Sequence, residues 1–198
     1  MSTITILGAG AMGSAIATPL QDAGHQVRLW GTHLDDHLIA AVRDGKPHPR
    51  TKVPLADGVA TFQAGDLEAA LDGTDVVVLA VSSAGVIDIA RLAAPHLLEA
   101  QAILLTSKGF APDHGGHIVL LPQAVETELV VPRPVVAVGG PCKANEVAAR
   151  RPTAAIFAAA EGARDWARFA TTDAYRVAHT TDRDGVELCA ALKNVYAI

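Results

Sequence analysis

The sequence predicts an α/β fold in which a mostly parallel, doubly wound sheet is covered by helices on both faces. Three observations lead to this prediction. Apolar runs such as VVVLA at residues 76–80 are almost continuous, as in strands that are buried on both faces. Segments with helical spacing of apolar residues alternate with these runs. A glycine-rich turn joins the first apolar run to the first helical segment.

The first elements follow directly from these patterns. The first strand is expected at residues 4–7, and the helix after it continues until Gly24. The second strand is expected at residues 26–30. The strand at residues 76–80 leads into a helix at about residues 85–92.

The later elements repeat the same unit. Buried strands are expected at residues 103–105, 135–138 and 154–157. The proline-rich stretch at residues 48–54 fits neither a helix nor a strand, and it predicts a surface connection.

Composition excludes several classes of function. The 198 residues carry a net charge of −5 without a basic stripe, so we expect no nucleic acid as a partner. No apolar stretch reaches the roughly 20 residues of a membrane span. The start lacks the basic region of a secretory signal, and Cys142 and Cys189 do not make a disulfide framework, so a cytoplasmic location is expected. Any bound phosphate must therefore be held by a local site.

A glycine motif lies between the first expected strand and the first expected helix. Its GxGxxG spacing is typical of a turn that binds a dinucleotide. The first glycine permits the turn, the second lets the pyrophosphate approach the backbone, and the third lets the helix pack on the strand. The anion then lies at a helix N-terminus, where free N–H groups favour it. This predicts a Rossmann-type sheet whose cofactor-binding residues at the turn are Gly8, Ala9, Gly10, Ala11, Met12 and Gly13.

The end of the second strand bears on the choice between NAD(H) and NADP(H). An NAD site usually has an acid about 20 residues after the glycines, where it binds a ribose hydroxyl. Thr32 and His33 occupy that place, and Asp35 and Asp36 come later. No arginine stands there to bind a 2′-phosphate. We interpret Thr32 and His33 as contacts to the ribose or its phosphate, or as a solvated turn, so both cofactors stay open, with a modest preference for NADP(H).

Two lysines are candidates for the chemistry. Lys108 follows the expected strand at residues 103–105, and it therefore lies at the carboxyl edge of the sheet, where such folds bind ligands. Lys193 lies among small and apolar residues of the last expected helix. Such a lysine is either a surface residue with its stem on apolar neighbours or a functional cation. Carbonyl reduction needs a proton donor, and a desolvated lysine can serve.

Other chemical patterns are weaker. Gly139 and Gly140 follow an expected strand, and they either let a ligand approach the backbone or form an ordinary strand-to-helix turn. Cys142 has no histidine beside it, which disfavours a nucleophilic role. The chain has 8 histidines, but no Cys or carboxylate cluster completes a ligand set at a recognised spacing, so no metal site is expected.

The last segment begins a helix and stops within its pattern. Leu188, Leu192 and Val195 lie at helical spacing, and no Gly, Pro or polar cap follows them. We therefore expect the sequence to be part of a longer one.

Taken in order, six segments resemble the NAD(P)-dependent sn-glycerol-3-phosphate dehydrogenases of bacteria and archaea. They span essentially the whole chain, and SKG, GGP and LKNVYAI are the most specific parts. The segments are GAGAMGSAIA, LWGT, HPRTKVPL, LLTSKGF, GGPCKANEVAARRPTA and GVELCAALKNVYAI. The resemblance implies hydride transfer between C4 of a nicotinamide, from NADP(H) or NAD(H), and C2 of dihydroxyacetone phosphate. It also implies that the product, glycerol 3-phosphate, feeds glycerophospholipid synthesis and that the intact enzyme is a homodimer.

The resemblance also assigns residues by motif. It makes Lys193 the proton donor and acceptor, and it makes Lys108 a ligand of both cofactor and substrate. It adds Gly140 and Asn194 to the substrate site, and it adds Ala144 to the cofactor site.

Some positions depart from the family's pattern. Ala11 and Met12 stand where the family has a serine and an aromatic residue, which weakens side-chain contacts to the cofactor. Thr32 stands where an arginine is frequent, which bears on the preference for NADP(H). Cys142, expected in the substrate site, stands where Ser or Thr is usual, so its hydrogen bond to the substrate should be weaker.

The resemblance completes the expected domain organisation. The family continues into a helical domain that carries an aspartate and an Arg-Asn pair for the substrate. We therefore expect residues 1–182 to form the NAD(P)-binding domain and residues 183–198 to be the first helix of a truncated helical substrate domain. This chain alone is then expected to bind the cofactor without appreciable turnover.

Two alternatives remain at this point. One is another dehydrogenase with a Rossmann domain and a helical domain, of the 6-phosphogluconate, 3-hydroxyacid or ketopantoate type. The other is a non-catalytic NAD(P)-binding remnant. A substrate panel separates the first from our interpretation, and binding measured together with turnover separates the second.

Overall fold

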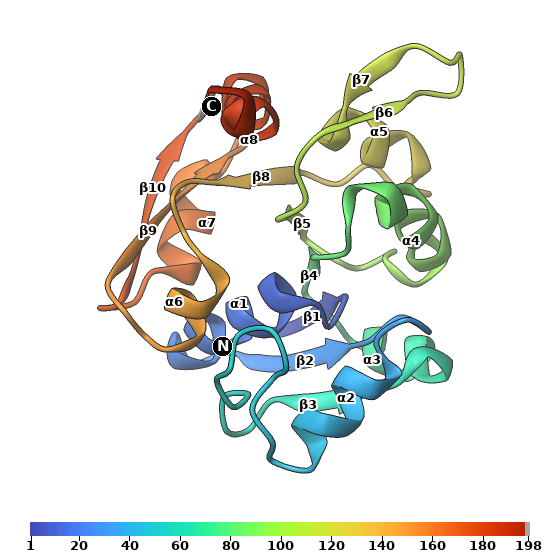
Figure 1. The fold of residues 1–198 in the computed structure, drawn as a ribbon. Coiled ribbons are helices and arrows are strands. Elements are labelled where there is room, and N and C mark those ends of the chain that lie inside the picture. Colours follow the sequence, from blue (N-terminus) through green and yellow to red (C-terminus); the bar gives the residue numbers. More distant parts are fainter. Residues whose placement is uncertain (197–198) are drawn as a thin grey trace.

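A large sheet with helices on both faces forms the molecule (Figure 1). This computed structural model describes the backbone of residues 1–196 and the side chains of residues 1–193. The strands of the large sheet are β1 (Thr3–Leu7), β2 (Gln26–Trp30), β3 (Ala60–Phe62), β4 (Val76–Leu79), β5 (Ala102–Leu105), β8 (Val135–Gly139), β9 (Thr153–Ala158) and β10 (Tyr175–Thr180). A small antiparallel hairpin consists of β6 (Phe110–Pro112) and β7 (Ile118–Leu120).

Helices connect most of these strands. They are α1 (Ala11–Asp22), α2 (Asp36–Arg43), α3 (Leu67–Leu71), α4 (Val86–Ala93), α5 (Leu121–Glu128), α6 (Ala144–Ala148), α7 (Ala163–Ala170) and α8 (Arg183–Tyr196). Three short 3₁₀ turns are η1 (Ala64–Asp66), η2 (Ser83–Gly85) and η3 (Ala94–His96). No helix in the described part of the chain is both long and apolar enough to cross a membrane.

The strand order confirms the predicted doubly wound α/β class. It is β10-β9-β8-β5-β4-β1-β2-β3, and every neighbouring pair is parallel except β8 and β9. The chain starts at the centre of the sheet, winds outward to β3, and then returns through β4 to the other half. The carboxyl ends of β1, β4, β5 and β8 therefore meet at one edge, where loops can build a site.

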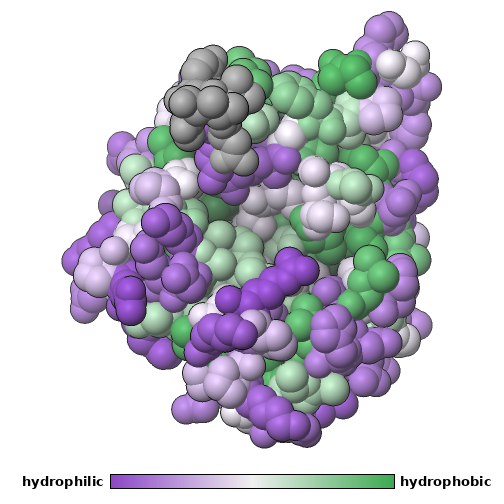
Figure 2. Space-filling model, in the orientation of Figure 1, coloured by the Kyte–Doolittle hydropathy of each residue, from purple (hydrophilic) through white to green (hydrophobic). Residues whose placement is uncertain are grey.

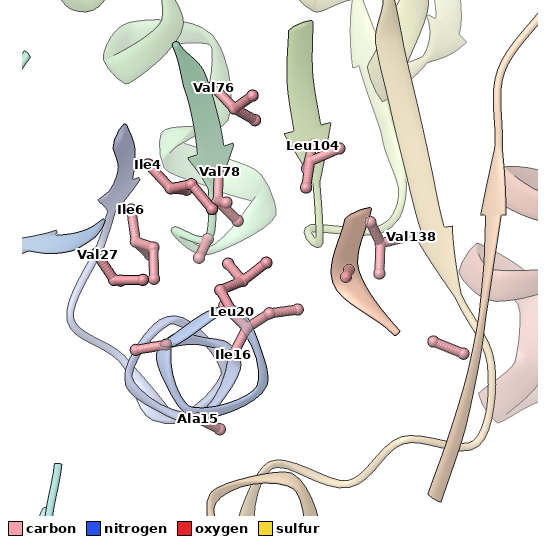
Figure 3. Close-up of a cluster of buried hydrophobic side chains, with 14 of the residues drawn as sticks. Ile4, Ile6, Ala15, Ile16, Leu20, Val27, Val76, Val78, Leu104 and Val138 are labelled. Carbon is pink, nitrogen blue, oxygen red and sulfur yellow. The ribbon is translucent and has the colours of Figure 1, made fainter. Parts of the chain in front are cut away.

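Two hydrophobic cores lie on opposite faces of the sheet, which explains the continuous apolar runs. Val76 and Val78 of β4 belong to the core under α1, α6 and α7, whereas Val77 and Leu79 belong to the core under α3, α4 and α5. Figure 3 shows Ile4 and Ile6 of β1 pointing toward Ile16 of α1 in the first core.

Some expected features differ from the structure. The connection at residues 48–54 is not simply a surface loop, because His48 is 1% exposed and Thr51 is 5% exposed. Strands β3 and β10 were not expected, because they are edge strands without a continuous apolar run. The expected last helix corresponds to α8, which is seen from Arg183 to Tyr196. The side chain of Val195, part of its expected apolar face, lies outside the described residues.

Candidate active site

Two cavities open at the carboxyl edge of the sheet. The first, of about 350 Å³, lies beside the turn after β1 and the turn after β4. The second, of about 600 Å³, lies between the loops after β5 and β8 and the helix α8. Figure 2 shows that the middle of the pictured face is hollowed, with apolar and weakly polar residues inside and hydrophilic residues around the rim.

The glycines of the turn between β1 and α1 differ in what surrounds them. Gly8 has a φ of +111°, and a Cβ atom there would lie 2.8 Å from Cγ1 of Val81. A Cβ atom on Gly13 would lie 1.9 Å from the Gly8 carbonyl oxygen, so this glycine is needed for the helix to pack on the turn. A Cβ atom on Gly10 would meet nothing within 4 Å. The open space at Gly10 is where a ligand can approach the backbone.

The N-terminus of α1 is a suitable place for an anion. Gly10 is the N-cap residue, it provides no side-chain hydrogen bond, and the first turn contains no acid. The first N–H groups of a helix have no partner within it, and the helix dipole adds positive potential there. Ala11 and Met12 are half-buried in this first turn, and neither lines a cavity.

The first cavity has the predicted Thr32 and His33 in its wall, together with Gly8, Gly10 and Arg50. Arg50 is thus an arginine of this cavity that does not stand at the end of the second strand, where no arginine is present. It comes from the loop between α2 and β3. No local pattern signals this, because the loop has to fold back onto the glycine turn.

Asp35 closes the turn beside this cavity. Its Oδ2 atom accepts hydrogen bonds from the N–H of Thr32 at 3.0 Å, from the hydroxyl of Thr32 at 2.9 Å and from the N–H of Ala9 at 3.3 Å. Ala9, a predicted cofactor ligand, thus already has a partner for its N–H group. Its carbonyl group lies 3.0 Å from Nε2 of His48.

The second cavity brings together Lys108 and Lys193, which are far apart in the sequence. Gly140 also lines it, as do Val186 and Cys189 of α8. Lys108 is half-buried, and its ammonium group donates a hydrogen bond to the Thr106 carbonyl at 2.8 Å. Burial lowers the pKa of Lys108, and the charge of Lys193 lowers it further. Lys193 itself is exposed.

A buried acid lies beneath Lys108. The side chain of Glu187 accepts a hydrogen bond from the Gly109 N–H at 3.1 Å, and the residue is only 1% exposed. Burial raises the pKa of Glu187, and the hydrogen bond and the charges of Lys108 and Arg183 oppose this effect. Sequence reasoning missed Glu187, because an acid on an amphipathic helix usually points to solvent.

Packing explains the two glycines at the end of β8, of which Gly139 is its last residue and Gly140 follows it. A Cβ atom on Gly139 would lie 2.8 Å from Cγ1 of Val186, so this position lets α8 approach the strand. Gly140 has a φ of +111°, and a Cβ atom there would lie 3.0 Å from Cα of Ala155. The turn is therefore both a structural feature and, at Gly140, part of a cavity wall.

For the remaining predicted residues, the structure shows no position in a cavity wall. Cys142 and Ala144 are half-buried against the core under α1, and neither lines a cavity. Asn194 belongs to α8, but its side chain lies outside the described residues.

Two other observations concern where a phosphate or a metal ion could bind. A hollow of about 680 Å³ lies at the opposite edge, before β4 and β5, but its charged lining is mainly acidic, with Asp66, Glu68, Asp72 and Glu99. It is therefore a poor place for a phosphate. Among the residues whose side chains are described, no group of three His, Cys, Asp or Glu is arranged to hold a metal ion.

Known proteins with similar sequences are glycerol-3-phosphate dehydrogenases. Residues 3–164 match the family described as NAD-dependent glycerol-3-phosphate dehydrogenase N-terminus. The NADP(+)-dependent glycerol-3-phosphate dehydrogenase of Archaeoglobus fulgidus is 39% identical over 198 residues, which cover 98% of this chain and 58% of that protein. The glycerol-3-phosphate dehydrogenase of Symbiobacterium thermophilum is 38% identical, with coverage of 98% and 56%.

A solved structure gives the same result. The crystal structure of glycerol-3-phosphate dehydrogenase from Coxiella burnetii superimposes with a TM-score of 0.84 at 31% identity, and the match covers 99% of this chain and 59% of that one. The chain thus spans between 56% and 59% of the length of these three relatives.

Proposed function

Because the chain belongs to the family of NAD-dependent glycerol-3-phosphate dehydrogenases, we propose that it binds NAD(P)(H) and contributes to the interconversion of sn-glycerol 3-phosphate and dihydroxyacetone phosphate. In this proposal residues 1–182 bind the dinucleotide, and α8 brings Lys193 to the substrate. The product is a precursor of glycerophospholipids. The family match favours this reaction over those of the 6-phosphogluconate, 3-hydroxyacid and ketopantoate enzymes.

The residues at the first cavity fit a dinucleotide. The open space at Gly10 lets a pyrophosphate reach the N-terminus of α1, where backbone N–H groups are free of side-chain caps. Gly8 and Gly13 keep the turn tight enough for this approach. The N–H groups at the start of α1 therefore attract a phosphate locally, although the net charge of the chain, −5, repels anions.

The wall of the first cavity favours a cofactor with a 2′-phosphate. Arg50, Thr32 and His33 all line this cavity. A guanidinium group binds phosphate with two parallel hydrogen bonds, whereas the hydroxyl of Thr32 already donates its hydrogen to Asp35. Asp35 lines the same cavity, but one of its oxygens is already used by the protein's own donors. We therefore propose NADP(H) as the preferred cofactor.

Of the two lysines of the second cavity, one transfers a proton and the other stabilises negative charge. When bound, a nicotinamide would supply or accept the hydride at C2 of the substrate. Lys193 donates a proton to the C2 oxygen during reduction and takes it back during oxidation. Lys108 stabilises the developing negative charge and the substrate phosphate from the half-buried side of the cavity. That these two distant lysines line one cavity with Gly140 is the observation that carries the proposal.

A variant of Lys193 tests the assignment. In the intact enzyme, Lys193→Ala should lower the rate of dihydroxyacetone-phosphate-dependent NADPH oxidation, followed at 340 nm, by at least about 100-fold, because a general acid contributes at least that much. NADPH affinity, measured by calorimetry, should change by less than about 3-fold. Lys143→Ala is the matched control, since that lysine is 75% exposed and pairs with Glu146 on its own helix. Near-normal turnover by Lys193→Ala would refute the assignment.

The second candidate function is binding of the dinucleotide without catalysis. The glycine turn and the first cavity by themselves suffice for such binding. Binding and turnover measured on the whole chain decide between the two. Tight NADPH binding with no detectable turnover supports the second candidate, whereas both together support the dehydrogenase.

We also propose a cytoplasmic location and, for the enzyme, a homodimer. Cys142 and Cys189 are both unpaired, as is usual in a reducing compartment. Leu188 of α8 is 44% exposed, and Ile118 of β7 is 70% exposed, so both offer apolar area for a contact. Sedimentation analysis of the purified protein tests the dimer, and a monomer at all concentrations would contradict it.

A further inference from the structure

His48 is buried in a loop most of whose neighbouring residues are exposed. The residue is 1% exposed, although its neighbours Pro47 and Pro49 are exposed. Its backbone closes a short turn, because its N–H donates to the Val53 carbonyl at 2.9 Å and its carbonyl accepts from the Lys52 N–H at 2.9 Å. The ring therefore points inward from a turn that its own backbone fixes.

The imidazole ring has a backbone partner on each side. Nε2 lies 3.0 Å from the carbonyl oxygen of Ala9. Nδ1 accepts hydrogen bonds from the N–H of Arg50 at 3.2 Å and from the N–H of Thr51 at 3.4 Å. A carbonyl can only accept and a backbone N–H can only donate, so the hydrogen must be on Nε2 and Nδ1 must be bare. The contacts therefore assign a neutral ring in a single tautomer.

The surroundings of the ring also favour the neutral form. Burial lowers the pKa of His48, and the nearby charges of Arg50 and His37 lower it further. The Ala9 carbonyl and the charge of Asp35 act in the opposite direction but do not overcome this effect.

The ring thus joins two segments of the first cavity's wall that share no helix or strand. Ala9 lies between Gly8 and Gly10, which line the cavity at the glycine turn, and Arg50 lines the same cavity from the loop after α2. No hydrogen bond from the Arg50 side chain to protein is seen among the residues with described side chains, so its place is set through its backbone.

We propose that His48 is a positioning residue that holds Arg50 at a fixed place relative to the glycine turn and thereby sets the selectivity for NADPH over NADH. This inference rests on the proposed function, and it adds a residue that touches no cofactor. The selectivity arises because the 2′-phosphate is the group that distinguishes the two cofactors, and Arg50 is the cationic residue whose backbone N–H is bound by the ring.

Two variants of His48 each keep the hydrogen bonding of one ring nitrogen and remove that of the other. In His48→Asn the amide oxygen can replace Nδ1 as the acceptor for the turn, but the side chain is too short to reach Ala9. In His48→Gln the amide nitrogen can replace Nε2 as the donor to Ala9, but nothing accepts from the N–H of Arg50. We expect His48→Asn to keep the ratio of NADH to NADPH dissociation constants within about 3-fold of the unmodified chain. We expect His48→Gln to lower that ratio by about tenfold, toward the value of Arg50→Gln.

Calorimetric titration of the whole chain with NADPH and with NADH measures these ratios. His96→Asn, at the opposite edge of the sheet, is the control histidine, and it should change neither constant. An unchanged ratio in His48→Gln overturns the inference while leaving the proposed function intact. An unchanged ratio in Arg50→Gln also overturns it. If the unmodified chain binds neither cofactor, the proposed function fails instead.

A spectroscopic measurement tests the inference without any variant. Long-range ¹H–¹⁵N correlation spectra of the unmodified chain at pH 7 should show His48 as the neutral tautomer with hydrogen on Nε2. A charged ring, or hydrogen on Nδ1, would remove the acceptor for the Arg50 turn and overturn the inference, even if both variants fail to fold.

Discussion

At the scale of single residues, the three motif glycines between β1 and α1 serve different purposes. Gly8 and Gly13 are required by the protein's own packing, since side chains there would collide with Val81 and with the Gly8 carbonyl. Gly10 has open space around it and a φ of −66°, which any residue can adopt. At Gly10 no contact within the described protein requires a glycine, so the approach of a ligand is the explanation for the small residue there.

This difference makes a pair of substitutions informative. Gly10→Ala should keep the melting temperature within about 2 °C, because the added methyl group meets no protein atom. It should weaken NADPH binding by at least about tenfold, because the methyl group occupies the approach of the pyrophosphate. Gly13→Ala should instead lower the melting temperature markedly. Thermal melting and calorimetric titration measure both effects, and undiminished binding by Gly10→Ala would show that the dinucleotide lies elsewhere.

The residues of the site differ in how far the sequence could predict them. The glycines and Lys108 follow from local order along the chain, because a turn or loop after a buried strand must lie at the carboxyl edge. Arg50, His48 and Glu187 could not be found this way. Their positions depend on contacts with Ala9 and Gly109, which are distant in sequence.

At the scale of secondary structure, the packing of α8 on β8 decides where Lys193 lies. Val186 fits against Gly139, and Glu187 binds the loop that carries Lys108. The helix is thus held to the sheet at two consecutive residues near its first turns.

Gly139→Ala should disturb this packing. Its methyl group would lie 2.8 Å from Cγ1 of Val186 and 3.3 Å from Cγ2 of Ile156. We expect a loss of about 1–3 kcal/mol in the free energy of unfolding, as is usual when a packed contact is overfilled. Val186→Ala should recover part of this loss in the double variant, which a double-mutant cycle by urea unfolding detects.

Gly65→Ala is the control for this prediction, because a side chain at Gly65 meets nothing within 4 Å. It should stay within about 0.5 kcal/mol of the unmodified chain. Full additivity of Gly139→Ala and Val186→Ala would mean that the contact does not hold α8.

The sequence predicted the central elements and missed the peripheral ones, for a physical reason. Strands β4, β5 and β8 are buried on both faces, so their sequences are almost entirely apolar. Strand β10 lies at an edge with partly exposed residues, and the β6–β7 hairpin has only three residues in each strand. Their stability comes from neighbouring elements and leaves little periodicity in the sequence.

At the scale of the whole molecule, a doubly wound sheet could be predicted from the alternation of elements. The antiparallel placement of β9 against β8 could not. A strand buried in a parallel pair and one buried in an antiparallel pair have the same apolar composition, so composition contains no information on direction.

The stability of the whole fold should depend on pH through Glu187. Because burial raises the pKa of this acid above its ordinary value of 4.5, the folded chain keeps the proton over a range in which the unfolded chain has lost it. The free energy of unfolding therefore decreases as the pH rises from about 4.5 through the raised value, and the loss persists above it. Glu187→Gln cannot ionise, and its amide oxygen can still accept from Gly109.

We therefore expect Glu187→Gln to be more stable than the unmodified chain at pH 8, with the difference shrinking toward pH 5. Urea unfolding at several pH values measures this difference. Glu161→Gln, on an exposed turn, should show no such trend. A difference that is independent of pH would mean that the carboxyl group of Glu187 does not lose its proton in the folded chain over this range.

The attachment of α8 has a mechanical consequence. Arg183 at its first residue forms an ion pair with Glu126 of α5 and reaches the Val135 carbonyl of β8, whereas Lys193 lies about ten residues, or roughly 15 Å, farther along the helix. The helix is thus held at Arg183, Val186 and Glu187, all near its first turns, and a tilt of about 5° at this end displaces Lys193 by roughly 1 Å. A displacement of that size can change a reaction rate by about 100-fold. Contacts at α5 thus influence the position of Lys193, which is the reacting group in the proposed function.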